Sequence, residues 1–505
     1  LVIICISIIA AIEWHGSLLG DLMEDMTIVQ TENKDFGGLP IWSLEDLYSG
    51  PEGKDLKAAF AEAEGRIDSF QRSYNGKLDD LSAKAFGEAI VEYEAIGDLI
   101  GRIGSFAQLY HSQNVSDPER SRFYQNIIDH MTTLSSKSVF FTLEINQLDD
   151  STLEAKLSDP IAAKYRPWLR DLRVYKNHEL GEELERLLHE KSVSGRAAWV
   201  RLFDQTEAAI RCEVEGQKLT LTEALNGLSD GQPEKRRVAA KGISKALSEK
   251  ASLFAYITNV LAKDKATEDE WRKYEYPVSA RNLANLVEDE VVDALIAAVR
   301  ESYVHTSHRY YALKAKWLGK DNLDYWDRNA PLPNSENMLI SWEDAKTTVL
   351  DAYGGFSPSM ADTAKLFFER GWIDAPASPG KASGAFSHPT VPSAHPYILL
   401  NYLGSPRDVM TLAHELGHGV HQVMAADQGL LLSDTPLILA ETASVFGEML
   451  TFRSLLSKED RFEHRRALLA GKVEDMLNTV VRQISFHEFE RHVHSERKES
   501  EITLD

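Results

Sequence analysis

Two histidines and a glutamate in the segment Asp408 to Met424 could bind and use a metal ion. The segment has the sequence DVMTLAHELGHGVHQVM, in which His414 and His418 stand four residues apart. In a helix this spacing places both imidazoles on one face, and Glu415 beside the first histidine can act as a general base. With 16 histidines and 78 acidic residues among 505, fewer than roughly one accidental HExxH match is expected in ten such chains. The spacing therefore predicts a zinc-binding helix.

A zinc site needs a third protein ligand besides the two histidines. The scheme HExxHxxGxxH does not supply it, because His421 and Met424 occupy its glycine and last histidine positions. A carboxylate from a later helix is the alternative, and the apolar segment 437–450 contains Glu441, with Glu448 seven residues later on roughly the same face. Two carboxylates there are costly unless a cation or hydrogen bonds compensate them. We interpret Glu448 as a residue that orients a ligand histidine, with a surface acid as the alternative. We interpret His421 as a surface or packing residue, with support of a metal ligand as the alternative.

Such a ligand set indicates hydrolysis of peptide bonds. Two neutral imidazoles and one carboxylate leave zinc a position for water and lower the pKa of that water toward about 7. Glu415 can take the proton of the water as it attacks a scissile carbonyl and later deliver it to the leaving amine, while the metal stabilises the oxyanion. The sequence leaves open whether the metal is zinc, cobalt or manganese.

The composition predicts a large protein with at least two lobes and argues against a nucleic-acid partner. The chain has 505 residues, 43% of them hydrophobic, and a single core stops growing well before this length. The net charge of −23, from 78 acidic and 55 basic residues, would repel phosphates. The apolar run at residues 1–12 is too short to span a bilayer, which takes about 20 residues, so we expect no stable membrane association. We interpret the run as sequence absent from the native protein, with a signal or anchor remnant and a structured element as the alternatives.

Helical periodicity dominates the elements that must position the site. Apolar residues at three- and four-residue spacing predict helices from Lys54 onward, and the segment 396–402 is a short β-rich run before the metal-binding helix. We therefore expect a small sheet packed beside that helix. The alternating segment 213–223 predicts a short hairpin or a turn. Further helices are predicted at 83–109, 118–142, 159–165, 180–200, 233–261, 289–317 and 406–424.

The chain resembles the thimet-oligopeptidase family of zinc peptidases, in its oligoendopeptidase F branch. The resemblance covers roughly residue 40 to the C-terminus and is strongest after residue 278. It is carried by the motifs GKASGAF (380–386), HPYILLNY (395–402), PRDVMTLAHELGHGVH (406–421), SDTPLILAETAS (433–444), RNLAN (281–285) and YWDRNAPLP (325–333).

The resemblance implies a mainly α, two-lobed zincin-type metallopeptidase with a small β-sheet beside the metal-binding helix. A deep channel would restrict substrates to short unstructured peptides, and the enzyme would be a cytoplasmic bacterial endopeptidase that recycles peptides. By position, one zinc ion would be held by His414, His418 and Glu441, with Glu415 as the base. The resemblance also marks a cleft-lining strand region where an extended substrate can add to a sheet edge, with ordinary sheet packing as the alternative. The candidate substrate contacts there are Ser383, Gly384, Ala385, Phe386, His395 and Tyr397.

From these patterns we expect a poorly defined N-terminal extension at 1–35, an N-terminal helical lobe at 36–210 and a catalytic domain at 211–505. The family continues beyond a segment like 482–500 into further helices and a His- and Tyr-rich loop, so we expect this catalytic domain to be truncated at its C-terminus. Two alternatives stay open: a zinc carboxypeptidase with a similar metal helix, and a zinc-binding but catalytically impaired fragment.

Overall fold

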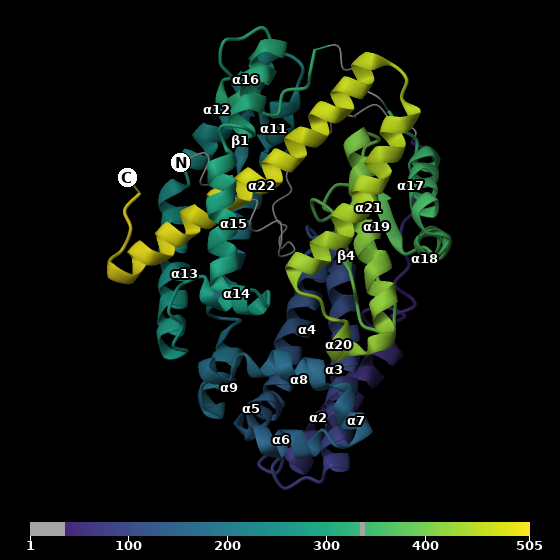
Figure 1. The fold of residues 1–505 in the computed structure, drawn as a ribbon, viewed down its shortest axis with the longest axis vertical. Coiled ribbons are helices and arrows are strands. Elements are labelled where there is room, and N and C mark those ends of the chain that lie inside the picture. Colours follow the sequence, from purple (N-terminus) through teal and green to yellow (C-terminus); the bar gives the residue numbers. More distant parts are fainter. Residues whose placement is uncertain (1–35, 334–338, 505) are drawn as a thin grey trace. The chain divides into compact units, whose positions relative to one another are not determined.

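The computed structural model describes residues 36–333 and 339–504, which are mainly helical (Figure 1). The predicted extension at 1–35 lies outside the described residues. Among the described residues, the chain forms two compact units, one made of 195–333 and 456–504 and the other of 36–194 and 339–455. All the candidate site residues fall in the second unit, and the predicted division at residues 210/211 stays a prediction.

The second unit contains an N-terminal set of helices and a later set that includes the HExxH segment. Several of the N-terminal helices begin at a capping side chain: Ser82 accepts a hydrogen bond from the third amide of its helix, and Asp117 precedes a proline at the first helical position. The N-terminal helices are α2 (Lys54–Tyr74), α3 (Ala83–Ser112), α4 (Pro118–Ser136), α5 (Val139–Gln147), α6 (Asp150–Lys156), α7 (Pro160–Lys164), α8 (Arg166–Arg173) and α9 (Glu182–Lys191). The later helices are α17 (Trp342–Phe356), α18 (Pro358–Glu369), α19 (Pro406–Ala425), α20 (Leu430–Ser433) and α21 (Leu437–Lys458).

A three-stranded sheet in the second unit supports α19. Its strands are β3 (Ile373–Pro376), β4 (Phe386–His388) and β5 (Tyr397–Tyr402), in the order β3-β5-β4. β3 is parallel to the central strand β5 and β4 is antiparallel to it, with Ser387 opposite Ile398. Four successive residues of β5 are buried, as expected for a strand covered on both faces. This sheet confirms the predicted small sheet beside the metal-binding helix, and Figure 1 shows β4 beside α19.

The first unit is built from helices and one hairpin. The antiparallel strands β1 (Arg211–Val214) and β2 (Gln217–Thr220) form a hairpin that begins two residues before the predicted segment and ends three residues before its end. The long helix α22 (Phe462–Glu499) packs against α13 (Ala251–Trp271) and α15 (Asp289–Ser302) (Figure 1). The remaining helices are α10 (Arg196–Ala208), α11 (Leu221–Asn226), α12 (Pro233–Ser248), α13 (Ala251–Trp271), α14 (Ser279–Ala284), α15 (Asp289–Ser302) and α16 (Ser307–Trp317).

Four predictions of a single long helix are wrong, because the structure has two helices in each of these segments. The segment predicted at 233–261 breaks at Glu249 and Lys250, where α12 ends and α13 begins. The segments 118–142, 180–200 and 289–317 break in the same way, between α4 and α5, α9 and α10, and α15 and α16. Apolar spacing continued across each break, so periodicity alone gave no signal for it. No helix among the residues described is both long and apolar enough to cross a membrane.

Candidate metal centre

Helix α19 carries the HExxH residues, and its start is fixed by local sequence. Ser405 accepts a hydrogen bond from the amide of Asp408, and the Asp408 carboxylate accepts one from the amide of Ser405, which forms a capping box. Pro406 occupies the first turn, where its missing N–H costs nothing. The predicted helix at 406–424 is therefore confirmed within one residue.

Helix α21 brings its glutamates to α19 because two glycines allow the two backbones to approach. A Cβ at Gly417 would lie 2.8 Å from both the Ala443 carbonyl oxygen and the Ser444 Cα. A Cβ at Gly447 would lie 3.0 Å from the Ala413 carbonyl oxygen. A side chain at Gly417 would require one of the two helices to move, and one at Gly447 would also displace the Tyr353 ring. Figure 1 shows α19 and α21 running side by side.

The close approach gathers three of the predicted residues into one cluster. His414, His418 and Glu441 each offer a ligand atom, and these atoms lie within 4.8 Å of one another. The His414 Nε2 is 3.3 Å from one Glu441 oxygen, and the His418 Nε2 is 3.6 Å from the other. Two imidazole nitrogens and a carboxylate oxygen at this separation match the donor set that zinc prefers.

Glu448 contacts His414 on the edge of the imidazole ring that faces away from Glu441. Its Oε2 is 3.3 Å from the His414 Nδ1, so that Nδ1–H can donate to it while Nε2 faces Glu441. This contact fixes the tautomer that leaves Nε2 free for a metal. Ser444, which is fully buried, donates its hydroxyl hydrogen to Glu441 Oε2 over 2.8 Å.

The electrostatics of the cluster favour a cation among these side chains. Burial opposes a charge on His414, but hydrogen bonds with Glu441 and Glu448 raise its pKa to about 10. Burial also opposes the charge on Glu441, and hydrogen bonds from the two histidines and Ser444 nevertheless hold its pKa below the ordinary value. The carboxylates therefore attract positive charge to the position that a divalent ion would take, so the residues present fit a metal.

Glu415 lies on the same helix but faces strand β4. Its side chain is 6% exposed, and burial raises its pKa to about 7, although the neighbouring histidines and the backbone amide of Ser387 lower it. A carboxylate with its pKa near neutral is suited to accept and return a proton.

The candidate substrate contacts differ in how exposed they are to solvent. Ser383 and Gly384 are exposed, and Ala385 and Phe386 are half-buried. Asn401 donates hydrogen bonds from its Nδ2 to the carbonyls of Ala382 and Gly384, over 2.9 Å each, which fixes the loop before β4.

The other two candidates, His395 and Tyr397, stand close together in sequence but differ in exposure. His395 stacks on Trp372 with ring centroids 4.0 Å apart and contacts Asp46 through Nε2. Tyr397 is fully buried and donates its hydroxyl hydrogen to the Ser43 carbonyl, so the structure does not bring its side chain to the cluster.

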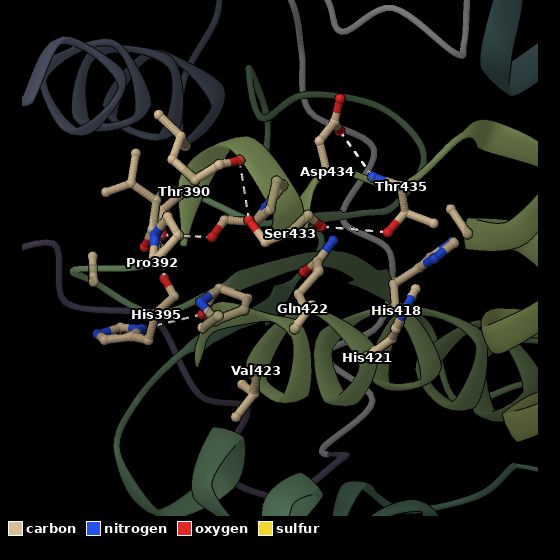
Figure 2. Close-up of a pocket in the computed structure, with 18 of the residues that line it drawn as sticks. Thr390, Pro392, His395, His418, His421, Gln422, Val423, Ser433, Asp434 and Thr435 are labelled. Atoms are coloured by element: carbon tan, nitrogen blue, oxygen red, sulfur yellow. Dashed lines mark hydrogen bonds between the residues drawn. The ribbon is translucent and has the colours of Figure 1, made fainter. Parts of the chain in front are cut away.

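A cavity of about 760 Å³ adjoins the metal-binding cluster (Figure 2). His418, His421 and Gln422 line one wall, and His395 lines another. His421, interpreted as a surface or packing residue, therefore faces this cavity and is partly exposed. The side chains of a peptide bound at the cluster would have space here.

Three supporting residues were not identified from the sequence. Ser444 follows Glu441 by three residues, a helical spacing that was available as a signal. Tyr353 of α17 donates its buried hydroxyl hydrogen to the Ala413 carbonyl over 2.6 Å and so holds α19 from a distant segment. Neither the Tyr353 contact nor the amide of Ser387 has a local signal, because both depend on how distant segments pack.

Comparisons with known proteins agree with this geometry. Residues 228–505 match the model of peptidase family M3, and residues 144–211 match that of Oligopeptidase F. Oligopeptidase PepF of Bacillus subtilis is 26% identical over 472 residues, which are 91% of this chain and 69% of the relative. An Oligoendopeptidase F homolog of Lactococcus lactis is 24% identical, over 91% of this chain and 77% of the relative.

Solved structures show the same fold. A structure described as a peptidase from Chlamydophila abortus matches with a TM-score of 0.71 and 22% identity, over 92% of this chain and 78% of that one. The structure of oligoendopeptidase-F from Enterococcus faecium matches with a TM-score of 0.63 and 20% identity, over 89% of this chain and 77% of that one.

Proposed function

This chain belongs to peptidase family M3 and is a metalloendopeptidase, and from that premise we propose that it hydrolyses short unstructured peptides with one zinc ion. The observation that carries the proposal is the cluster of His414, His418 and Glu441, whose ligand atoms lie within 4.8 Å beside the buried Glu415. The names of the relatives, which include Oligopeptidase PepF and Oligoendopeptidase F homologs, support peptides as the substrate class.

In the proposed mechanism, His414, His418 and Glu441 hold the ion, and Glu448 keeps the His414 ring in the orientation that presents Nε2. A bound zinc ion supplies Lewis-acid activation of water and of the scissile carbonyl. Glu415 accepts a proton from the attacking water on its carboxylate and returns it to the leaving amine. The backbone amide of Ser387, which interacts with that carboxylate, helps to orient it during both transfers.

The substrate contacts in this proposal lie on the loop before β4 and along the cavity. Residues 383–386 offer exposed or half-exposed backbone, to which an extended peptide can add as a further strand. His395 lies in the cavity wall, where it can contact a peptide side chain.

The test uses internally quenched peptides that are blocked at both ends. An endopeptidase cleaves them when loaded with zinc, and removal of the metal by a chelator abolishes the cleavage, which added zinc restores. Cleavage only of peptides with a free C-terminus would show a carboxypeptidase instead. Zinc binding without turnover on any peptide would show a catalytically impaired chain.

A further inference from the structure

One residue of strand β4 is held by two side chains of α19. Glu415 and Gln422 are seven residues apart, which places them two turns apart on one face of the helix. The backbone amide of Ser387 interacts with the Glu415 carboxylate and contributes to lowering its pKa. The Gln422 amide group makes two further bonds to Ser387: its Nε2 donates to the backbone carbonyl over 3.3 Å, and its Oε1 accepts from the hydroxyl over 2.9 Å.

The hydrogen-bond pattern of the sheet explains why the Ser387 backbone is available to α19. Ser387 lies opposite Ile398 on β5, and the Ile398 amide donates to the Trp372 carbonyl, on the side of the sheet away from β4. In an antiparallel pair, residues that do not bond to each other direct their N–H and C=O groups outward. The Ser387 peptide groups therefore leave the sheet at its edge, where they meet the side chains of Glu415 and Gln422.

We propose that Gln422 is a positioning residue that acts on Glu415 through Ser387. This proposal rests on the proposed function. By fixing both the carbonyl and the hydroxyl of Ser387, Gln422 holds this part of the edge strand so that its N–H stays directed at the carboxylate of the base. Figure 2 shows Gln422 and His418 projecting from α19 on the same side. The two hydrogen bonds between Gln422 and Ser387, which we call the clamp, therefore lie next to the metal ligands, and Gln422 is not itself a ligand.

An amide group is suited to this position because it offers one donor and one acceptor. A leucine of similar size removes both bonds to Ser387. A glutamate keeps the acceptor for the hydroxyl but has no hydrogen to donate to the carbonyl when ionised. Without the clamp β4 can shift relative to α19, and a displacement of about 1 Å near reacting groups can cost up to about 100-fold in rate.

The experiment compares Gln422→Leu and Gln422→Glu with wild type, all zinc-loaded, on a blocked quenched peptide. We expect kcat to fall roughly 10- to 100-fold in both variants and KM to change by a smaller factor, because the metal ligands are unaltered. Zinc content and thermal stability should match wild type. Gln428→Leu, which removes an exposed glutamine just beyond α19, is the control and should keep wild-type kinetics.

The Ser387→Ala substitution tests whether Gln422 acts through its bonds to Ser387 or only by packing. As a single substitution it removes only the bond from the Ser387 hydroxyl to Gln422, so it should lower kcat by less than Gln422→Leu does. Added to Gln422→Leu it should lower kcat no further, because its partner is already lost. Fully additive losses, or a kcat for Gln422→Leu within twofold of wild type, would overturn the proposal, as would loss of zinc in step with activity.

Hydrogen exchange on the metal-free protein tests the clamp without any turnover. Exchange of the backbone amides in a peptide that spans β4 should be faster in Gln422→Leu than in wild type and unchanged in Gln428→Leu. Unchanged exchange in Gln422→Leu would overturn the proposal even if the enzyme is active. If wild-type protein with bound zinc cleaves no peptide, the proposed function fails, and hydrogen exchange still decides whether Gln422 holds β4.

Discussion

Replacing Glu415 with glutamine should separate zinc binding from hydrolysis. The two side chains have nearly the same size, and the glutamine carbonyl oxygen can still interact with the backbone amide of Ser387. The change leaves the ligand atoms of His414, His418 and Glu441 in place. What the variant loses is the ability to accept the proton of the attacking water, because a neutral amide is not a base at neutral pH.

The magnitude follows from the role of the base and from its burial. A positioned general acid or base contributes about 10²–10⁴ in rate, so we expect kcat to fall by that factor, which corresponds to about 3–5 kcal/mol in the activation free energy. Since Glu415 is 6% exposed and burial raises its pKa, a neutral side chain there removes a desolvation cost, and the folded state should be no less stable than wild type.

The assay measures turnover of a blocked quenched peptide together with zinc content on the same protein samples. Glu343→Gln, at an exposed position of α17, is the control for loss of one negative charge and should behave as wild type. Turnover of the Glu415→Gln variant within tenfold of wild type, at equal zinc content, would refute the assignment of Glu415 as the base.

Three further predictions concern the metal support, the pH dependence and the sheet. Glu441→Ala should lower zinc retained after dialysis more than Glu448→Ala, because the first removes a ligand and the second its support; equal losses would contradict this order. Burial lowers the pKa of His111 to about 4 from an ordinary 6.5, so the folded protein binds fewer protons than the unfolded chain between these pH values. Its free energy of unfolding should therefore fall by about 3 kcal/mol as pH decreases through that window, and urea titrations of His111→Gln should lack this component. Lys381→Met should destabilise the protein by about 3–5 kcal/mol in urea, because it breaks a buried ion pair, whereas Lys365→Met, in an exposed pair, should cost less than about 1 kcal/mol.

The parts of the site that one helix encodes could be predicted from the sequence. The spacing of His414 and His418 and the capping residues before α19 are local features, and the structure has them where periodicity and capping chemistry place them. The small sheet was also predictable, because its central strand is a short β-rich run. A carboxylate from a later helix could be expected as the third ligand, because the pattern HExxHxxGxxH is not present in this segment.

The parts that depend on contacts between distant segments could not be predicted. The pairing that places Ser387 opposite Ile398 determines which of its peptide groups face α19, and a shift of one residue would turn them toward the sheet. The bond between Tyr353 and the Ala413 carbonyl joins residues 60 positions apart. The breaks inside the long predicted helices could not be predicted because the local pattern hides them: the apolar spacing typical of a helix is satisfied on both sides of each break.

The distance between the histidine helix and the glutamate helix is set by backbone contact, and this gives the glycines of the motif a physical role. Gly417 lies between the two ligand histidines, and a Cβ there would meet the backbone of Ser444, three residues after Glu441. The same turn of α21 therefore touches α19 and supplies the ligand. Any side chain at Gly417 would move Glu441 away from both imidazoles, because the obstructing atoms belong to the main chain and cannot rotate aside. The HELGH segment thus specifies both the ligands from its own helix and the distance at which the third ligand arrives.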